Sequence, residues 1–257
     1  MAKGIPVRRA EFDDERLKRE NFKMVRKTAA IVQSCYIPWK GYFDLINMVD
    51  EFVLYDDVQF TRRDWRNRNR IKTPQGLQWL SVPVEVKGKY HQSIKDTLVS
   101  ESSWGRQHWD TLRHNYARAT YFERYAEIFK EIYLTETDPH LSRINLRFIE
   151  AVCGILGIGS RITWSMDYEL ADGKSERLLG LCQAVGCNRY LSGPSARDYM
   201  DLDLFAAHDI EVEFMDYSGY PEHPQLFGPF EHHVTILDLI FNVGPAARTY
   251  MKSFGRQ

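Results

Sequence analysis

Two apolar runs, each followed by polar residues, constrain the fold of this chain most. The segment Ile31–Ile46 predicts a strand, a loop and then a helix that begins near Gly41, because an apolar run gives way to an amphipathic one. The second run, Phe52–Gln59, contains the acidic pair Asp56 and Asp57 after its apolar part. In an open α/β sheet, ligands bind beyond the carboxyl ends of the strands. We therefore expect both motifs, and the function, at one edge of a parallel sheet.

Strand-like and helix-like segments alternate through the rest of the chain. The predicted strands cover 29–33, 51–55, 161–165, 189–192 and 211–215. The predicted helices cover 41–48, 101–117, 121–132, 140–156, 174–185, 196–207 and 234–241. Strands separated by helices of this length imply right-handed crossovers and a parallel sheet. The prediction is an α/β protein with a Rossmann-like parallel sheet of about five strands.

The length of 257 residues fits one domain with an insertion. Pro74 to Gly76 form a turn signal between two apolar runs, which predicts a β-hairpin. We expect residues 60–155 to insert this hairpin and a helical cap over the binding face. Residues 29–257 would form the single domain, and residues 1–28 a basic N-terminal extension with a short helix at 13–23.

Composition excludes several function classes. A formal net charge of −1 gives no overall reason to expect a nucleic acid or an anionic membrane as partner. No apolar run approaches the length of a membrane span, and the first 28 residues lack the apolar stretch of a secretory signal. The four cysteines show no metal-ligand spacing, so we expect reduced thiols, no metal site and a cytoplasmic protein.

The loop after the first strand is the first candidate site. Gln33 and the segment Tyr36–Tyr42 place a Gly at the start of a helix, where free backbone N–H groups favour a phosphate or carboxylate. Trp39 adds a flat stacking surface. The alternative is that Tyr36, Ile37 and Trp39 simply fill the end of the sheet.

The acidic pair at the end of the second strand is the second candidate. Adjacent strand residues point to opposite faces, so Asp56 and Asp57 cannot both face the core. The free carboxylate could hold Mg²⁺, accept a ribose hydroxyl or act as a general base. The alternative is that both carboxylates pair with the arginines that follow them.

The segment Arg62–Lys72 is the third candidate, because six of its eleven residues are Lys or Arg and two are Asn. Arg forks bind phosphate in a bidentate manner, so Arg66, Asn67, Asn69 and Lys72 are expected to hold a phosphate or carboxylate. Basic charge beside Trp65 is also typical of RNA binding, which is the rival interpretation. A solvated basic surface is the third reading.

Two further groups complete the candidates. His108 shares a predicted helix face with Trp104 and can carry a proton near neutral pH, although a lone helical His is more often structural. The segment Tyr190–Tyr199 ends a strand in a turn before a helix, which offers Ser192, Gly193, Ser195 and Tyr199 as ligand contacts. The sequence contains no GxSxG, Walker or GxGxxG motif.

Eight ordered motifs resemble the WbqC-like family. They are QSCYIPWKGYFDLI, DDVQF, WRNRNRIKT, WLSVPV, WGRQHW, YLSGPSARDYM, YPEHPQLFGPF and ILDLIFNVGP, and the match runs from about Ile31 to Pro245. Members of this family often occur among genes for O-antigen and other surface polysaccharides, and they have been proposed to be glycine or aminoacyl transferases. The resemblance therefore implies amide formation on an amino sugar carried by a nucleotide.

A remoter similarity links the chain to adenylate-forming enzymes of the HUP fold. Trp39 to Tyr42 stand where those enzymes carry an HxGH motif, with the Gly kept and both histidines replaced. SGPSARDY resembles the serine-bearing nucleotide motif of that class. ATP with Mg²⁺ is thus one cofactor that the resemblance implies, with Lys40 or Arg66 supplying positive charge. An acyl-CoA donor is the other.

The combined prediction is an acyl or aminoacyl transferase, or an amide-forming ligase, that acts on a nucleotide-linked amino sugar. Asp57 or His108 would accept the amine proton. The pocket would comprise Gln33, Tyr36, Trp39, Gly41, Tyr42, Ser192, Gly193, Ser195 and Tyr199. The alternative is a non-catalytic nucleotide- or RNA-binding module that uses Arg62–Lys72. A small-molecule partner is favoured over nucleic acid, and a homo-oligomer stays open.

Overall fold

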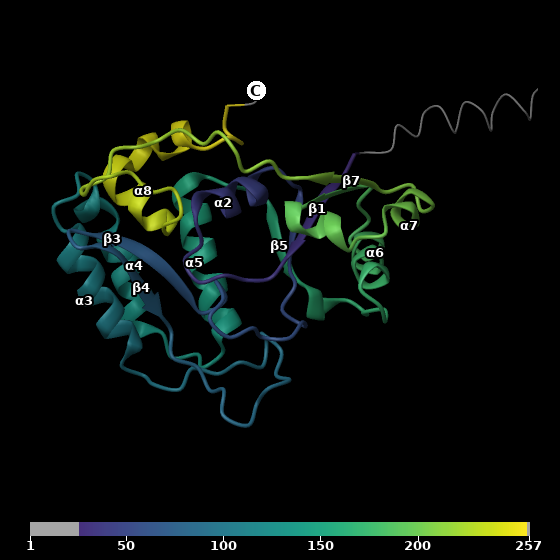
Figure 1. Ribbon diagram of the computed structural model, residues 1–257, viewed down its shortest axis with the longest axis horizontal. Coiled ribbons are helices and arrows are strands. Elements are labelled where there is room, and N and C mark those ends of the chain that lie inside the picture. The colour runs from purple at the N-terminus through teal and green to yellow at the C-terminus, as the bar shows by residue number, and fades with distance from the viewer. Residues whose placement is uncertain (1–25, 256–257) are drawn as a thin grey trace, which may run out of the picture.

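A five-stranded parallel sheet forms the centre of the computed structural model, which describes residues 26–255 (Figure 1). The strands are β1 (Thr28–Val32), β2 (Glu51–Leu54), β5 (Arg161–Trp164), β6 (Arg189–Ser192) and β7 (Glu211–Phe214). Their order is β5-β2-β1-β6-β7, and all four pairings are parallel. From β1 the chain adds β2 and β5 on one side, and it then returns to add β6 and β7 on the other side of β1. The predicted Rossmann-like α/β class is confirmed.

Helices cover both faces of this sheet. They are α2 (Lys40–Asn47), α5 (Leu141–Leu156), α6 (Ser175–Ala184), α7 (Leu202–Ala206) and α8 (Ile236–Val243). Three short 3₁₀ helices complete the connections, η1 (Ser165–Asp167), η2 (Pro194–Asp198) and η3 (Gly244–Tyr250). The predicted helix at 13–23, and all but the last three residues of the predicted extension, lie outside the described residues.

The single helix expected at 196–207 is wrong, because the chain forms η2 and α7 there instead. The side chain of Asp201 accepts a hydrogen bond from the Leu204 N–H at 3.1 Å and starts α7 afresh. Residues between the two helices have non-helical backbone angles, with a ψ of −6° at Tyr199 and 94° at Asp201.

The connection from β2 to β5 holds the predicted insertion. It forms the antiparallel hairpin β3 (Arg68–Thr73) and β4 (Gly76–Ser81), followed by α3 (Trp104–Tyr116) and α4 (Phe122–Thr135). Gly76 has a φ of +109°, which only glycine adopts without strain and which the tight turn requires. In Figure 1 the hairpin, α3 and α4 lie on the side of the molecule away from α6 and α7.

Two hydrophobic cores of unequal size pack against the sheet. The larger joins α2, α5 and α8 to the insertion, and it contains large buried side chains such as Phe43, Phe129 and Phe148. The smaller lies on the other face and is formed mainly by α6, α7 and the sheet residues that face them. Within residues 26–255, no helix is long and apolar enough to cross a membrane.

Candidate functional site

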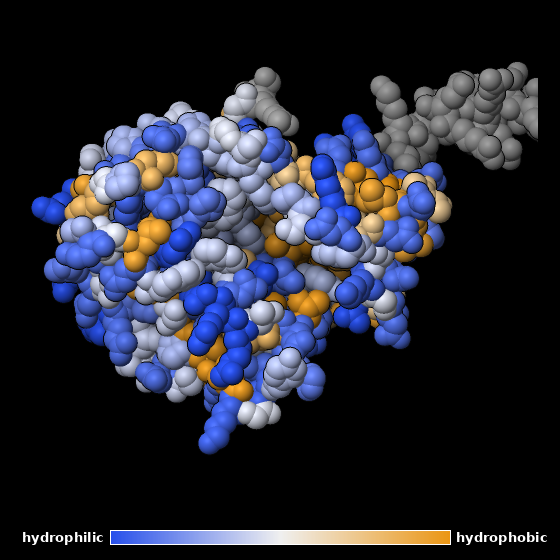
Figure 2. Space-filling model, viewed as in Figure 1, coloured by the Kyte–Doolittle hydropathy of each residue, from blue (hydrophilic) through white to orange (hydrophobic). Residues whose placement is uncertain are grey.

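A cleft of about 670 Å³ lies at the carboxyl ends of β1 and β6. These two strands are neighbours where the strand order reverses, which is the position where open α/β sheets bind their ligands. In Figure 2 the surface is hollowed between the part that carries α2 and the lobe that carries α6 and α7. The cleft is lined by Ile31, Val32, Gln33, Trp39, Tyr42, Leu45, Tyr55, Val58, Gly173, Lys174, Arg177, Leu178, Tyr190, Ser192, Gly193, Ser195, Ala196, Tyr199 and Tyr217.

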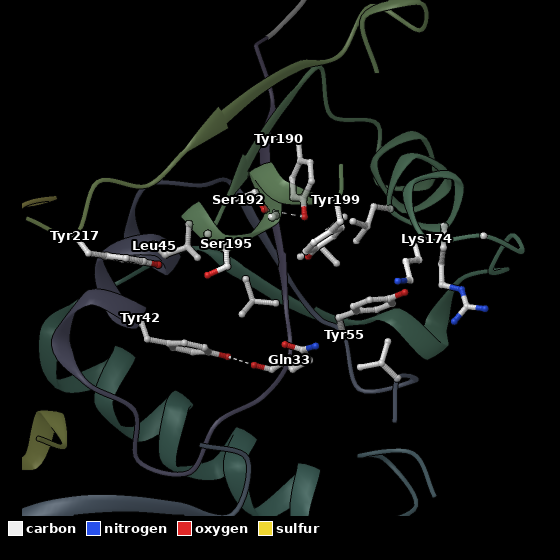
Figure 3. Close-up of a pocket in the computed structure, with 18 of the residues that line it drawn as sticks. Gln33, Tyr42, Leu45, Tyr55, Lys174, Tyr190, Ser192, Ser195, Tyr199 and Tyr217 are labelled. Atoms are coloured by element: carbon white, nitrogen blue, oxygen red, sulfur yellow. Dashed lines mark hydrogen bonds between the residues drawn. The ribbon is translucent and has the colours of Figure 1, made fainter. Parts of the chain in front are cut away.

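Aromatic side chains form one wall. Trp39 precedes α2, and its ring packs against Tyr217 with 5.2 Å between the ring centroids. The same ring folds back over Gly41, where a Cβ atom would lie 2.3 Å from the indole. Gly41 does not line the cleft. Because it has no side chain, the Trp39 ring can pack over it and form part of the wall. Figure 3 shows Tyr42 and Tyr217 on this side of the cleft.

Gln33 lies at the base of the cleft and is held from behind. The Arg66 guanidinium donates to the Gln33 Oε1 at 2.9 Å, and the Tyr42 hydroxyl donates to the Gln33 carbonyl at 3.1 Å. Arg66 also donates to the Cys35 Sγ at 2.8 Å. Because Arg66 occupies the side-chain oxygen of Gln33, the amide NH₂ of Gln33 remains available as a donor.

The opposite wall carries the cations of the cleft. Lys174 and Arg177 lie at the start of α6, where no side chain caps the helix. Neither residue forms an ion pair within residues 26–255. Figure 3 shows Lys174 and Tyr55 facing the cleft from this side. Two cations beside an uncapped helix N-terminus favour an anionic group.

Hydroxyl groups stand between these walls. Burial raises the pKa of Tyr55, Tyr190 and Tyr199, so their phenols stay protonated at neutral pH and can donate hydrogen bonds. Ser195 follows β6 in the turn that begins η2, and its side chain is exposed to the cleft. The walls therefore offer donors and cations, and the described lining contains no carboxylate or imidazole.

The two adjacent aspartates have different surroundings. Asp56 is fully buried, and its Oδ1 accepts from the Ser34 N–H at 2.8 Å while its Oδ2 has no partner. Burial raises the pKa of Asp56 to about 6. Asp57 pairs with Lys95 and accepts a hydrogen bond from Ser165. Neither carboxylate lines the cleft.

His108 lies inside the insertion rather than in the cleft. Its Nδ1 is 2.8 Å from the Tyr36 hydroxyl, which is itself 2.7 Å from the Tyr133 hydroxyl. Burial lowers the pKa of His108 to about 4, so the ring is neutral at physiological pH. Both Tyr36 and His108 thus join α3 to the loop after β1, away from the cleft lining.

The side chains of the basic segment Arg62–Lys72 do not form one site, because they point to different parts of the structure. Asn67 donates to the Val82 carbonyl at 2.8 Å, and Asn69 donates to the Ile37 carbonyl at 2.9 Å. Lys72 donates to the Gln225 Oε1 at 2.9 Å. Asn67 and Asn69 thus support the backbone, Lys72 holds the side chain of Gln225, and Arg66 positions Gln33. None of the four lines the cleft.

Seven of the expected binding residues do line the cleft together, namely Gln33, Trp39, Tyr42, Ser192, Gly193, Ser195 and Tyr199. Sequence reasoning missed Lys174, Arg177, Tyr55, Tyr190 and Tyr217. A signal existed for Lys174, since it begins the helix predicted at 174–185 and follows the carboxyl end of another strand of the same parallel sheet. The insertion expected over the binding face contributes no residue between 60 and 155 to the lining.

Comparisons with known proteins identify the family of this chain. The model of the WbqC-like protein family matches residues 33–250, which include the cleft residues from Gln33 to Tyr217. A protein of Mycobacterium tuberculosis, described as "Uncharacterized protein Rv1507c", is 54% identical over 226 residues, which cover 88% of this chain and 98% of that protein. No solved structure matches the chain. The chain therefore belongs to the WbqC-like family, which is associated with polysaccharide biosynthesis.

Proposed function

We propose that this protein forms an amide on a nucleotide-linked amino sugar, and that the cleft between β1 and β6 binds this substrate. The observation that carries the proposal is the division of the cleft into an aromatic wall and a cationic wall. A nucleotide has the matching division, because its base is flat and apolar and its phosphates are anionic. The volume of about 670 Å³ lies within the usual range for small-molecule sites.

In this proposal the base stacks beside Trp39 and Tyr217, and the phosphates bind Lys174 and Arg177. Charge-assisted hydrogen bonds from Arg to phosphate are short, strong and directional, and Lys adds a second positive charge. The sugar then lies near Gln33 and Ser195, between the two walls.

Amide formation requires a neutral amine to attack an activated carbonyl. A C–N bond forms, the C–O bond of an acyl adenylate or the C–S bond of an acyl-CoA breaks, and the amine loses a proton. The hydroxyls of Ser195 and Tyr199 are donors that can stabilise the oxyanion of the tetrahedral intermediate. The proton-accepting roles of Asp57 and His108 stay predictions, and both residues lie outside the cleft lining.

Isothermal titration of UDP- and dTDP-amino sugars, with and without Mg²⁺, tests the binding step. We expect Lys174→Gln with Arg177→Gln to raise Kd by at least about 140-fold, because hydrogen bonds to charged groups contribute about 1.5–3 kcal/mol each. The matched control is Arg113→Gln with Lys130→Gln, which removes two exposed charges on α3 and α4. Equal affinities in the two double variants would exclude the cationic wall as the phosphate site.

Mass spectrometry of the sugar after incubation tests the reaction. ATP with an amino acid, and acyl-CoA alone, distinguish the two acyl donors by the adduct and by release of AMP or CoA. We expect Ser195→Ala to lower kcat by about 100-fold, which is the lower end of the effect of losing one oxyanion donor. Asp57→Asn decides its role, since a normal kcat would remove it from catalysis. Binding without any amide product from either donor would leave a nucleotide-binding protein and refute the proposed reaction.

A further inference from the structure

The outward surface of the β3–β4 hairpin carries a cluster of arginine and tryptophan side chains that the cleft does not use. The Arg68 guanidinium lies 4.1 Å from the centroid of the Trp79 ring, and Arg70 lies 5.5 Å from the same ring. The rings of Trp65 and Trp79 are 5.4 Å apart between centroids. We call Trp65, Arg68, Arg70, Leu77 and Trp79 the hairpin face.

Strand alternation explains why these side chains share one surface. In β3, Asn69 and Ile71 are buried while Arg68 and Arg70 point to the opposite side. The register pairs Arg70 with Trp79 across the hairpin, which puts both on that outer side. Leu77 and Trp79 are 41% and 42% exposed, and Trp65 is 40% exposed. A cluster of large, exposed apolar side chains usually marks an interaction surface, whereas single exposed apolar residues do not.

The charge of this region differs from that of the whole chain. Residues 59–92 contain eight Lys and Arg side chains and only two carboxylates, in a chain whose net charge is −1. One carboxylate, Asp64, lies 3.7 Å from Arg66, and the other, Glu85, pairs with Lys89. Arg68 and Arg70 form no ion pair within residues 26–255.

Glu231 is the carboxylate that faces this cluster from another element. The backbone N–H of His233 lowers the pKa of Glu231 most, and the charge of Arg70 lowers it further. Glu231 therefore offsets part of the charge of Arg70 and leaves that of Arg68.

A second groove continues the cationic surface along the chain. It has a volume of about 750 Å³ and lies between residues 59–62 and the loop 86–92. Arg62, Lys87 and Lys89 line it, and no carboxylate does. Tyr90 at its edge is 77% exposed. Cations and exposed aromatic rings thus occur both on the hairpin face and on the loop that follows β4 in the chain.

We propose that the hairpin face and the loop 86–92 dock this protein onto an anionic phospholipid surface. Lys and Arg side chains near such a surface bind its negative headgroups. Trp and Tyr rings are the side chains that concentrate at the level of the headgroups, and Leu77 adds an apolar contact at the hairpin turn.

The geometry favours a membrane over a single-stranded nucleic acid. Nucleic-acid surfaces of this composition use free aromatic faces on which bases stack. Here Arg68 already covers a face of Trp79, and Trp65 and Arg70 contact the same ring. A base would therefore compete with these arginines for the ring faces, while the remaining guanidinium N–H groups can donate to phosphate oxygens.

Co-sedimentation of the full-length protein with vesicles tests the proposal. The vesicles are phosphatidylcholine alone, or phosphatidylcholine with about one third phosphatidylglycerol. We expect binding only to the anionic vesicles, and a marked loss of binding at high salt. Arg68→Gln with Arg70→Gln should lower the partition coefficient by about 30-fold, since each cation near such a surface contributes about fivefold. Trp65→Ala with Trp79→Ala should lower the partition coefficient by more than high salt lowers it for the unaltered protein.

The matched control is Lys174→Gln with Arg177→Gln, which removes the same charge from the cleft and should leave vesicle binding unchanged. Unfolding midpoints of all variants show whether each remains folded. Equal binding to neutral and anionic vesicles would overturn the proposal, as would no vesicle binding by the unaltered protein. Retention of single-stranded poly(U) on a filter without vesicle binding would identify a nucleic acid as the partner instead. Because the cleft variants and the hairpin variants are separate, failure here is distinguishable from failure of the proposed function.

Discussion

Two neighbouring carboxyl groups show how strongly position controls the chemistry of a single residue in this fold. Asp56 follows β2 toward the interior and has no exposed surface, whereas Asp57 is paired with Lys95. The alternation of side chains predicts that the two residues differ, but not which of them is buried. That outcome depends on Ser34, whose N–H binds Asp56, and on the inserted loop that supplies Lys95.

Asp56 makes stability depend on pH in a direction opposite to that of a paired surface aspartate. Its folded-state pKa of about 6 exceeds the unfolded value of 3.8, so its contribution is present below the unfolded pKa and is lost as pH rises through 6. We expect the unfolding free energy of the unaltered protein, relative to Asp56→Asn, to fall by about 2 kcal/mol from pH 4 to pH 7. Denaturant unfolding of both proteins across this range measures the difference. A constant difference would contradict a raised pKa.

A fit between neighbouring residues can be inferred from local sequence, whereas a contact between distant segments cannot. Trp39 and Gly41 are two residues apart, so the packing of the indole over Gly41 is a local property. Tyr36 is predicted as a site residue from its place in the loop after the first strand, and His108 from its helix face, and neither lines the cleft. Their partner Tyr133 belongs to α4, almost a hundred residues along the chain from Tyr36, and nothing in the local sequence of Tyr36 indicates that contact.

At the scale of elements, α3 and α4 meet through a glycine. A Cβ atom on Gly105 would lie 2.1 Å from the Tyr133 carbonyl oxygen, so the helix pair approaches closely only because position 105 lacks a side chain. The hydrophobic pattern predicts both helices. It does not predict this contact. A glycine inside a helix lowers helix stability through backbone entropy, so Gly105 in the sequence indicates a weaker helix rather than a close helix pair.

We therefore expect Gly105→Ala to destabilise the protein by about 2 kcal/mol, since helix and backbone must shift to admit the methyl group. Gly154→Ala in α5 is the matched control, because a Cβ atom there meets nothing within 4 Å. It should stabilise the protein by up to about 1 kcal/mol through better helix propensity. Urea unfolding measures both changes. Equal effects of the two substitutions would show that α3 and α4 can separate without cost.

Elements with a strong repeating pattern were predicted well, and elements that depend on a cap were not. The apolar face of α5 is periodic, and its predicted and observed ends differ by one residue at the start. By contrast, the hydroxyl and carboxyl groups between Pro194 and Asp203 support either one helix or two. The cap formed by Asp201 decides between them, and a hydrophobic pattern carries no information about it.

At the scale of the whole molecule, the sequence indicates a parallel sheet, but it does not give the strand order or the placement of the insertion. Alternating strands and helices leave few right-handed arrangements, and the cleft position follows from the strand order. From the sequence we expect the insertion at 60–155 to cover the binding face. Its apolar side chains, such as Phe122 and Phe129, instead pack with Phe241 of α8, which comes more than a hundred residues later.

The unequal cores have a consequence for motion. The aromatic wall of the cleft rests on the larger core, while Lys174 and Arg177 rest on the smaller one. Their helix α6 has ten residues against sixteen in α5, and it buries fewer side chains than α5 does. We expect its amide hydrogens to exchange with deuterium faster than those of α5, and a bound nucleotide to slow that exchange selectively. Hydrogen–deuterium exchange by mass spectrometry measures both rates, and equal protection of α5 and α6 would contradict the expectation. Slower exchange in α6 alone would mean that the cleft closes from one side. The lobe that binds the phosphates would move toward an aromatic wall that does not move.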